Sequence, residues 1–327
     1  MPPPVRRTLA LRLSLGAALV LAPTAGAGNG GLAPPEPESP NAERILDLYW
    51  LLSGIAVFIF LLVTVPLVIF VVRYRSRGRD RAEEGPQVRG NRNLEVGWTV
   101  GAVLILVVIA SVVFYKLPGI RNLEEAGAAG ELRVQVEGRQ FYWLYRYPNG
   151  AVAIDRLRAP AGRVVRTDIT APEGDVNHSF WVPALGGKFD AIPGVTTNLE
   201  FKAEQPGVYL GQCAEFCGIQ HAVMDLEVEV MAPDEFDRWV EGRASDPAEL
   251  GEEEFNGVCT KCHRLGDEKR LIGPSLSAAA LEDAAQLEQI VRNGQGEMPA
   301  VGRGWTDEQM RALTDYARQV ARRANGG

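Results

Sequence analysis

Histidine and cysteine are scarce in this chain: its 327 residues include only three histidines and four cysteines. All of them fall within short motifs whose spacing is typical of cofactor attachment, so no cysteine remains for a structural disulfide. Basic residues are also outnumbered, since 34 Lys and Arg against 41 Asp and Glu give a net charge of −7. Because a nucleic-acid surface needs a basic excess, this balance excludes nucleic acid as a partner. No internal repeat is apparent, and the length predicts two or three domains.

The N-terminus has the pattern of a secretory signal. Two arginines precede an apolar run over residues 9–21, and small residues stand at positions 25–27. The run is too short for the alternative, a first transmembrane helix. We expect residues 1–27 to be a cleaved signal peptide, which places the mature N-terminus outside the cytoplasm. Residues 28–44 are expected to form a flexible N-terminal segment.

Two long apolar runs follow, at residues 48–72 and 96–115, and neither contains a charged residue. A helix needs about 20 apolar residues to cross a bilayer, so each run is long enough. Pro66 would break a soluble helix but is tolerated in a membrane span. Two buried core helices are the alternative, but a globular core rarely contains two uninterrupted runs of this length. We therefore predict a two-helix transmembrane hairpin over residues 45–118.

The loop between the two runs predicts the orientation of the hairpin. Its arginines outnumber its acidic residues; they are Arg73, Arg75, Arg77, Arg79, Arg81, Arg89 and Arg92. Short loops rich in Lys and Arg remain in the cytoplasm. Both ends of the chain should therefore lie on the outer, periplasmic side of a bacterial cell (inner) membrane, with lipid around the hairpin.

The pattern changes to short strands beyond the hairpin. Segments 132–136 and 226–230 alternate apolar and polar side chains, as half-buried strands do, and Gly and Pro turns punctuate the stretch between them. We predict an all-β sandwich or barrel over residues 129–232. Residues 233–247 are interpreted as a linker with a short helix, and residues 248–325 as a small all-α domain. The predicted fold class is therefore multidomain.

A cluster of soft metal ligands lies late in the β-domain. Cys213, Cys217, His221 and Met224 fall in one short segment, and a second imidazole, His178, lies upstream. Thiolate and thioether ligands select copper, and imidazole binds copper readily. Zinc is the rival for two cysteines and two histidines, but the methionine gives zinc no benefit.

Glycines at 211 and 218 indicate that this cluster lies on a loop between strands. The alternative for the cysteines is a Cys213–Cys217 disulfide, which an oxidising compartment allows. The two histidines and the methionine beside them favour copper instead.

Residues 93–230 resemble subunit II of the haem–copper oxidases, whose hallmark is the run Cys213-Ala-Glu-Phe-Cys217-Gly-Ile-Gln-His221 with Val176-Asn-His178 upstream. The resemblance implies a cupredoxin barrel that holds a dinuclear copper centre, CuA, bridged by the two cysteines. The implied ligands are His178, Cys213, Glu215 (through its backbone carbonyl), Cys217, His221 and Met224. It also implies a magnesium site, shared with subunit I, at the Glu215 carboxylate.

Two further segments extend the resemblance. Residues 185–194 resemble the family stretch that packs on subunit I near the haem propionates. Glu95, near the start of the second span, resembles a family glutamate at the cytoplasmic mouth of a proton channel. The alternative for Glu95 is an interfacial anchor beside Trp98.

One position departs from the family pattern. Phe141 stands where the family usually has the tryptophan that receives electrons from soluble cytochrome c, while Tyr142 and Trp143 remain nearby as candidates for that role. Asp175, close to His178, is a candidate acidic docking residue; the alternative is a turn residue.

The C-terminal domain carries a second cofactor motif. Cys259-Thr-Lys-Cys262-His263 is the covalent attachment pattern of a c-type haem, and the adjacent histidine argues against a redox dithiol or half a zinc site. Met298, in a glycine-rich loop, is the expected second axial ligand, because Met/His ligation is usual in cytochromes c. Met310 shares helical spacing with apolar residues and is interpreted as core. From about Leu250 to Ala324 the chain resembles small class I cytochromes c.

Together the resemblances imply the electron-transfer subunit of a caa-type terminal respiratory oxidase. Electrons would come from cytochrome c or an upstream respiratory complex and pass through haem c and CuA to the haems of subunit I. Oxygen would be reduced to water there, with proton translocation, in contact with the other oxidase subunits. Every histidine of this chain is already assigned, so none is left to reduce oxygen. The alternatives are a subunit of a nitric or nitrous oxide reductase and a membrane-anchored copper-delivery protein.

Overall fold

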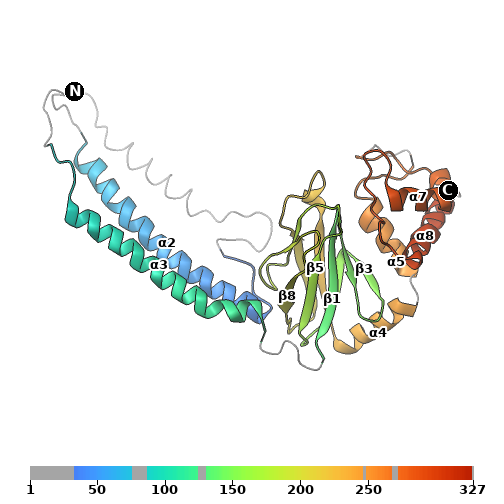
Figure 1. Cartoon of the computed structure of the whole chain (residues 1–327), viewed down its shortest axis with the longest axis horizontal. Coiled ribbons are helices and arrows are strands. Elements are labelled where there is room, and N and C mark those ends of the chain that lie inside the picture. Colours follow the sequence, from blue (N-terminus) through green and yellow to red (C-terminus); the bar gives the residue numbers. More distant parts are fainter. Residues whose placement is uncertain (1–32, 76–86, 124–129, 246–247, 267–271, 326–327) are drawn as a thin grey trace, which may run out of the picture.

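The computed structural model describes residues 33–75, 87–123, 130–245, 248–266 and 272–325. Three parts follow one another along the chain: a pair of long helices, a β-sandwich, and a helical domain on the side of the sandwich (Figure 1). The multidomain fold class predicted from the sequence is confirmed. The expected signal peptide lies outside the described residues.

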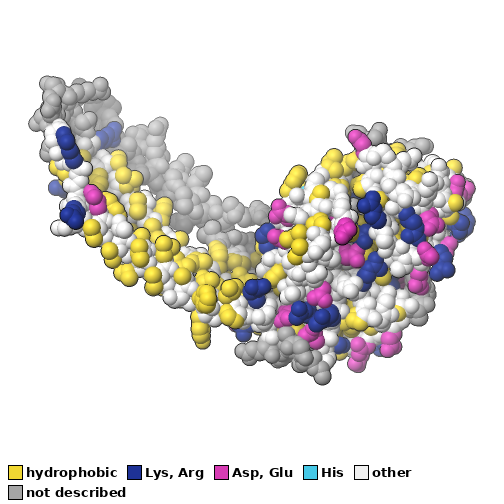
Figure 2. All heavy atoms as spheres, viewed as in Figure 1, with side chains coloured by type: hydrophobic (Ala, Val, Ile, Leu, Met, Phe, Trp, Pro, Cys, Tyr) yellow, Lys and Arg dark blue, Asp and Glu magenta, His cyan; other side chains and the backbone are white. Residues whose placement is uncertain are grey.

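The first part is a hairpin of two helices, α2 (Pro40–Arg73) and α3 (Arg92–Arg121). By length and composition both can cross a membrane. Their apolar side chains lie exposed along the length of the hairpin (Figure 2), as expected of surface that faces lipid. An ion pair of 2.6 Å between Lys116 and Asp47 joins the two helices near their outer ends. The helices are longer than the predicted spans, because Pro40 at the first helical position starts α2 inside the segment expected to be flexible.

Reciprocal side-chain caps fix the N-terminal end of α3. The Asn91 side chain accepts a hydrogen bond from the Leu94 N–H at 3.2 Å, and the Glu95 carboxylate accepts one from the Asn91 N–H at 3.1 Å. Such caps satisfy backbone donors that the first turn leaves unpaired. Glu95 therefore has a structural role at the helix start, and its role in a proton channel stays a prediction.

The β-domain consists of two five-stranded sheets, with the strand orders β3-β2-β1-β5-β8 and β4-β10-β9-β6-β7. The pairs β1–β5 and β4–β10 are parallel, whereas the other pairs are antiparallel. Both predicted strands are confirmed, in β1 and β10. The strands are β1 (Leu132–Arg139), β2 (Tyr142–Arg146), β3 (Val152–Ile154), β4 (Arg156–Pro160), β5 (Val165–Thr170), β6 (His178–Trp181), β7 (Phe189–Ala191), β8 (Thr197–Phe201), β9 (Gly207–Cys213) and β10 (Asp225–Met231).

Aromatic side chains fill the space between the sheets. Trp143, Tyr145 and Phe180 are fully buried, with Phe180 edge-on to both of the other rings. Burial of each large apolar side chain stabilises a fold by about 1.5–3 kcal/mol. The rigid core supports the strands that end at the cysteine and histidine cluster.

The segment expected to be a linker is mostly helix α4 (Pro233–Ser245). Phe236 and Trp239 of this helix pack on Tyr147 of the sandwich, and the Arg158 guanidinium lies 4.8 Å from the Trp239 ring centre. These aromatic contacts fix α4 to the β-domain. The short helix predicted within this segment is therefore present, and it is packed on the sandwich through Phe236, Trp239 and Val240.

The helical domain packs on the outer face of β2 and β3. Tyr142, Leu144 and Ile154 from these strands share one buried cluster with Phe255 and Trp305. The helical domain consists of α5 (Ala248–Glu254), the π-helical turn η2 (Phe255–Cys259), α6 (Ala278–Glu282), α7 (Ala284–Asn293) and α8 (Asp307–Asn325). A shared apolar core fixes the position of the two domains relative to one another more firmly than a flexible tether would.

Gly251 is the tightest point in the helical domain. A Cβ atom there would lie 2.1 Å from the backbone oxygen of Ala312, where α5 crosses α8. We expect Gly251→Ala to lower the free energy of unfolding of this domain by about 1–3 kcal/mol, because overpacking forces backbone shifts. Gly242→Ala in α4 is the control, since a Cβ atom there meets nothing within 4 Å. Guanidinium unfolding of the detergent-solubilised chain, followed by circular dichroism, should separate the two; equal stabilities would contradict the close crossing.

Candidate functional site

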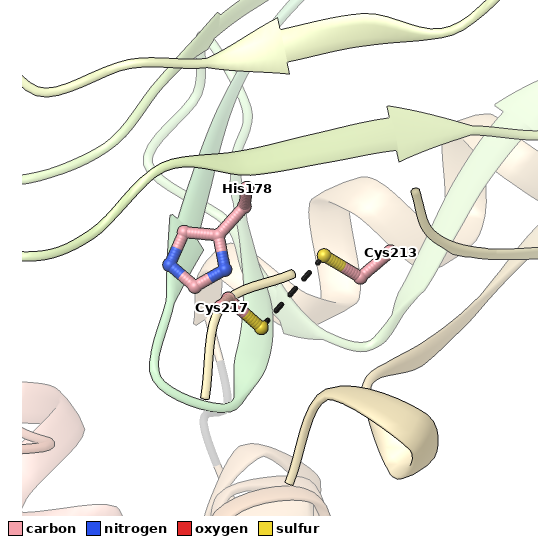
Figure 3. A group of neighbouring side chains, drawn as sticks. All are labelled: His178, Cys213 and Cys217. Carbon is pink, nitrogen blue, oxygen red and sulfur yellow. Dashed lines mark hydrogen bonds between the residues drawn. The ribbon is translucent and has the colours of Figure 1, made fainter. Parts of the chain in front are cut away.

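Two thiols and an imidazole converge at one end of the sandwich. His178 begins β6, Cys213 ends β9, and Cys217 follows in the next loop. The ligand atoms of all three are within 4.8 Å of one another, and all three residues are buried (Figure 3). Residues far apart in sequence therefore form one compact cluster.

The other predicted copper ligands approach the same two sulfurs. Cys217 Sγ lies 3.7 Å from His221 Nδ1 and 3.7 Å from Met224 Sδ. Cys213 Sγ lies 3.2 Å from the backbone oxygen of Glu215. The structure thus brings all six residues together, although their role as ligands stays a prediction.

The two cysteines are separate thiols. Their sulfurs lie 3.9 Å apart, whereas a disulfide requires about 2.0 Å. The hydrogen bond from Cys217 lowers the pKa of the Cys213 thiol well below its ordinary value, and the same pairing raises the pKa of Cys217. The lowered pKa of Cys213 favours its thiolate, which is the form that binds metal.

His178 fits a metal-binding role. Its ring is buried, and its Nδ1 atom has no hydrogen-bond partner among the described residues, which is unusual for a buried polar atom. Its Nε2 atom lies 3.3 Å from the Asp175 carboxylate. This is the arrangement of a metal-bound histidine, in which one nitrogen binds the ion and the other is held by a carboxylate. With two thiolate-forming cysteines and a thioether, the donor set fits copper.

Glycines permit the close packing around the cluster, although not all in the way the sequence indicated. Gly211 lies within β9 rather than in a loop, and a Cβ atom there would lie 2.6 Å from the backbone oxygen of Trp181. Gly218 does lie in the loop, with a positive φ of 130° that favours glycine. Gly138 leaves space for His178, since a Cβ atom there would lie 3.0 Å from the Cβ atom of His178.

The Asp175 carboxylate holds several of its neighbours together, and its role as a docking residue stays a prediction. Besides His178, its carboxylate accepts hydrogen bonds from the N–H groups of Val176 at 2.7 Å and Gln140 at 3.3 Å. These contacts favour the turn interpretation over acidic docking. They also give the residue a function that the sequence did not indicate, which is to orient His178.

We expect Asp175→Asn to weaken copper binding by about 10–100-fold, the usual cost of losing a carboxylate that orients a metal-bound histidine. The measurement is competition between the copper-depleted chain and a chelator. Glu173→Gln, two residues away and exposed, is the control and should bind copper normally. An unchanged copper affinity in Asp175→Asn would contradict the role of Asp175 in orienting His178.

The three aromatic residues expected to receive electrons lie between the two domains or within the core. The Phe141 ring packs near Gly218 of the cysteine loop. Tyr142 is buried under the helical domain, where its hydroxyl donates to the Val301 carbonyl at 2.6 Å. Trp143 is buried in the sandwich, with its ring centre 6.1 Å from that of His178. The indole of Trp143 and the Tyr142 ring are therefore closed to a diffusing protein, and their electron-transfer role stays a prediction.

The haem-attachment motif lies at the end of η2. Cys259 and Cys262 are half-buried and His263 is buried. His263 Nδ1 lies 2.7 Å from the carbonyl oxygen of Pro274. This contact orients the ring and leaves Nε2 as the nitrogen that would bind a haem iron. A Cβ atom on Gly273 would lie 2.4 Å from the His263 ring, so only glycine fits beside it. Two thiols with an oriented imidazole fit a covalently bound haem.

Met298 lies in a tight turn between α7 and α8, where its backbone pairs with Gln295 at 3.0 and 3.1 Å. It is half-buried, and its role as the second axial ligand stays a prediction. Met310 is buried, so its interpretation as a core residue is confirmed, and Phe255 and Trp305 are buried as well.

A buried thiol, imidazole and thioether cluster in a β-sandwich, joined to a membrane hairpin and to a haem-attachment domain, defines a membrane-anchored electron-transfer protein. Residues 27–115 match the family model of the cytochrome c oxidase subunit II transmembrane domain, and residues 152–231 match that of its periplasmic domain. Residues 246–316 match the model described as cytochrome c oxidase, cbb3-type, subunit III. The chain belongs to the cytochrome c oxidase subunit II family.

Named relatives agree with this membership. Cytochrome c oxidase subunit 2 of Alkalihalophilus pseudofirmus is 32% identical, over 90% of this chain and 92% of the relative. The Bacillus subtilis protein of the same name is 33% identical, over 78% of this chain and 76% of the relative. The solved periplasmic domain of cytochrome oxidase subunit II from Bradyrhizobium japonicum is 33% identical and covers 35% of this chain and 94% of its own, with a TM-score of 0.33.

Membership implies several properties directly. The chain is a component of a haem–copper oxidase, with subunit I as an implied partner and an electron-transfer role. CuA and haem c are the implied cofactors. The two apolar helices anchor the chain in a membrane, with the β-domain facing outward.

Proposed function

We propose that this chain carries electrons from a donor through haem c and then CuA to the haems of subunit I, where oxygen is reduced to water. When bound, haem c and the copper pair each accept and release one electron at a time. The donor is cytochrome c or an upstream respiratory complex, and the outer face of a bacterial inner membrane is the site. The observation that carries the proposal is the shared buried core of the helical domain and strands β2–β3.

This chain's own residues hold both cofactors. His178, Cys213, Cys217, His221, Met224 and the carbonyl of Glu215 would hold the copper pair. Cys259, Cys262, His263 and Met298 would hold the haem. The buried core that the helical domain shares with strands β2 and β3 would keep the two sites at a fixed separation. Fixed geometry suits transfer of an electron without rearrangement of ligands.

The Glu215 carboxylate faces the stretch proposed to contact subunit I. Its Oε2 atom lies 3.9 Å from Lys188 Nζ, which also lies 3.6 Å from Asp190. Both carboxylates are about half exposed and therefore available to a partner. We place the shared magnesium site at Glu215, because Mg²⁺ is usually bound by one or two carboxylates together with ligands from elsewhere. Residues 185–194 would then dock beside that ion.

Proton translocation by the whole complex is the last element of the proposal. Glu95 is exposed at the cytoplasmic end of α3, where a partner subunit could take up its carboxylate in a proton channel. Glu95 would then have two roles: it accepts the capping hydrogen bond from the Asn91 N–H, and it takes part in the proton channel.

The test is an optical and metal analysis of the purified complex, combined with gas uptake. We expect two copper ions and one covalent haem in this subunit, co-purification with a haem-containing subunit I, and oxygen uptake with reduced cytochrome c. Zinc in place of copper would contradict the electron-transfer role. Consumption of nitric oxide without oxygen uptake would show that the chain is a subunit of a nitric oxide reductase and not of an oxidase.

A further inference from the structure

The haem-attachment segment and the copper loop are joined by a direct hydrogen bond. The side-chain amide of Gln220 donates to the backbone oxygen of Lys261 at 2.6 Å. Gln220 precedes His221, a proposed copper ligand, and Lys261 precedes Cys262, a proposed point of haem attachment. The bond therefore connects the residue before a proposed copper ligand to the residue before a proposed haem-attachment cysteine.

A second set of contacts holds the same segment. Lys261 Nζ lies 2.5 Å from Asp155 Oδ2 and donates to the backbone oxygen of Phe141 at 3.0 Å. Both charged side chains are mostly buried, with 16% and 22% of their surface exposed. The other Asp155 oxygen accepts from the N–H of Trp143 at 2.8 Å. Charge-assisted hydrogen bonds in such surroundings are stronger and more directional than those at the surface.

The copper loop is itself tied to this region. The Gln140 side chain donates to the Cys217 backbone oxygen at 2.8 Å. The loop, the β1–β2 connection and the haem-attachment segment thus form one continuous hydrogen-bonded contact. We call Gln220, Asp155 and the Phe141 carbonyl the docking seat.

We propose that Gln220 and Lys261 are positioning residues for electron transfer from haem c to CuA: Gln220 fixes the haem-attachment segment on the copper loop, and Lys261 locks it in the docking seat. This inference rests on the proposed function. In the step, the ferrous haem loses one electron and becomes ferric, and the oxidised copper pair gains that electron. No bond forms or breaks, so the transfer depends on how closely and firmly the two sites are held.

The test uses the complete purified oxidase with Gln220→Leu, which removes the amide donor at similar volume. After photoreduction of haem c, we expect electron arrival at the copper to slow severalfold, because loss of the Gln220–Lys261 hydrogen bond loosens the contact and lengthens the distance that the electron must cross. Both reduction potentials and the copper bands should be unchanged. Hydrogen exchange in residues 255–264 should become faster, which reports the loosened seat independently of turnover.

Gln212→Leu is the matched control, since Gln212 is also a glutamine beside a copper ligand but lies exposed in β9. It should transfer electrons at the normal rate. Lys261→Met should slow transfer in the same way, and Lys261→Arg should restore most of the rate because the guanidinium also donates to Asp155.

Each outcome is decisive. Normal transfer in both Gln220→Leu and Lys261→Met, alongside normal transfer in the wild-type oxidase, would overturn this inference and leave the proposed function standing. Loss of the copper bands in Gln220→Leu, with normal transfer in Lys261→Met, would assign Gln220 to metal binding and also overturn it. Failure of the wild-type oxidase to pass electrons from haem to copper would overturn the proposed function itself.

Discussion

Cys217→Ser should abolish the copper absorption bands of the purified oxidase and reduce oxygen uptake to background, while the haem c spectrum remains normal. Cys217 contacts three of the other predicted ligands: its sulfur lies within 3.9 Å of Cys213, His221 and Met224. A serine hydroxyl is a hard, weakly acidic donor that does not replace a bridging thiolate. Optical and electron paramagnetic resonance spectra, with metal analysis, provide the measurement.

Ala214→Ser is the control for this variant, because it places a serine in the same loop without removing a sulfur. It should keep both copper bands and turnover. Haem absorption serves as an internal measure of folding, since the haem-attachment cysteines lie in another domain. Retention of two copper ions and normal bands in Cys217→Ser would show that the cysteine pair is not the bridge, and the proposed electron path would then lack its central site.

Sequence patterns were sufficient where the chemistry is local. The membrane runs, the period-two strands around 132–136 and 226–230, and the haem-attachment motif each depend on neighbouring residues. The proposed copper ligands could be grouped for a related reason, since five of the six lie within one short segment. Only His178 had to be joined from a distance, as the second imidazole upstream.

Contacts between domains could not be predicted in this way. The hydrogen bond from Gln220 to Lys261 and the Asp155–Lys261 pair join residues 41 and 106 positions apart. A single glutamine or lysine in a loop is usually solvated, so its sequence context does not indicate a partner. Asp175 illustrates the same point, because its position beside His178 in the sequence does not reveal its three intramolecular partners.

Met298→Ala should leave the haem covalently attached but lower its reduction potential and slow the feed of electrons from the donor into the haem. Attachment depends on Cys259 and Cys262, which the substitution does not touch. Loss of a thioether axial ligand removes the interaction that raises the potential of Met/His haems, and axial ligands set haem potentials over a range of about 0.8 V. Spectroelectrochemical titration of the purified oxidase measures the shift directly.

Met310→Leu separates axial ligation from packing. Met310 is 2% exposed in the core of α8, and a Leu/Met exchange of similar volume usually costs less than about 1.5 kcal/mol. The haem potential should therefore stay at its wild-type value in Met310→Leu while it falls in Met298→Ala. The reverse pattern would assign the axial position to Met310 and require α8 to open toward the iron. An unchanged potential in both variants would mean that neither methionine binds the iron, which would overturn the assignment of Met298.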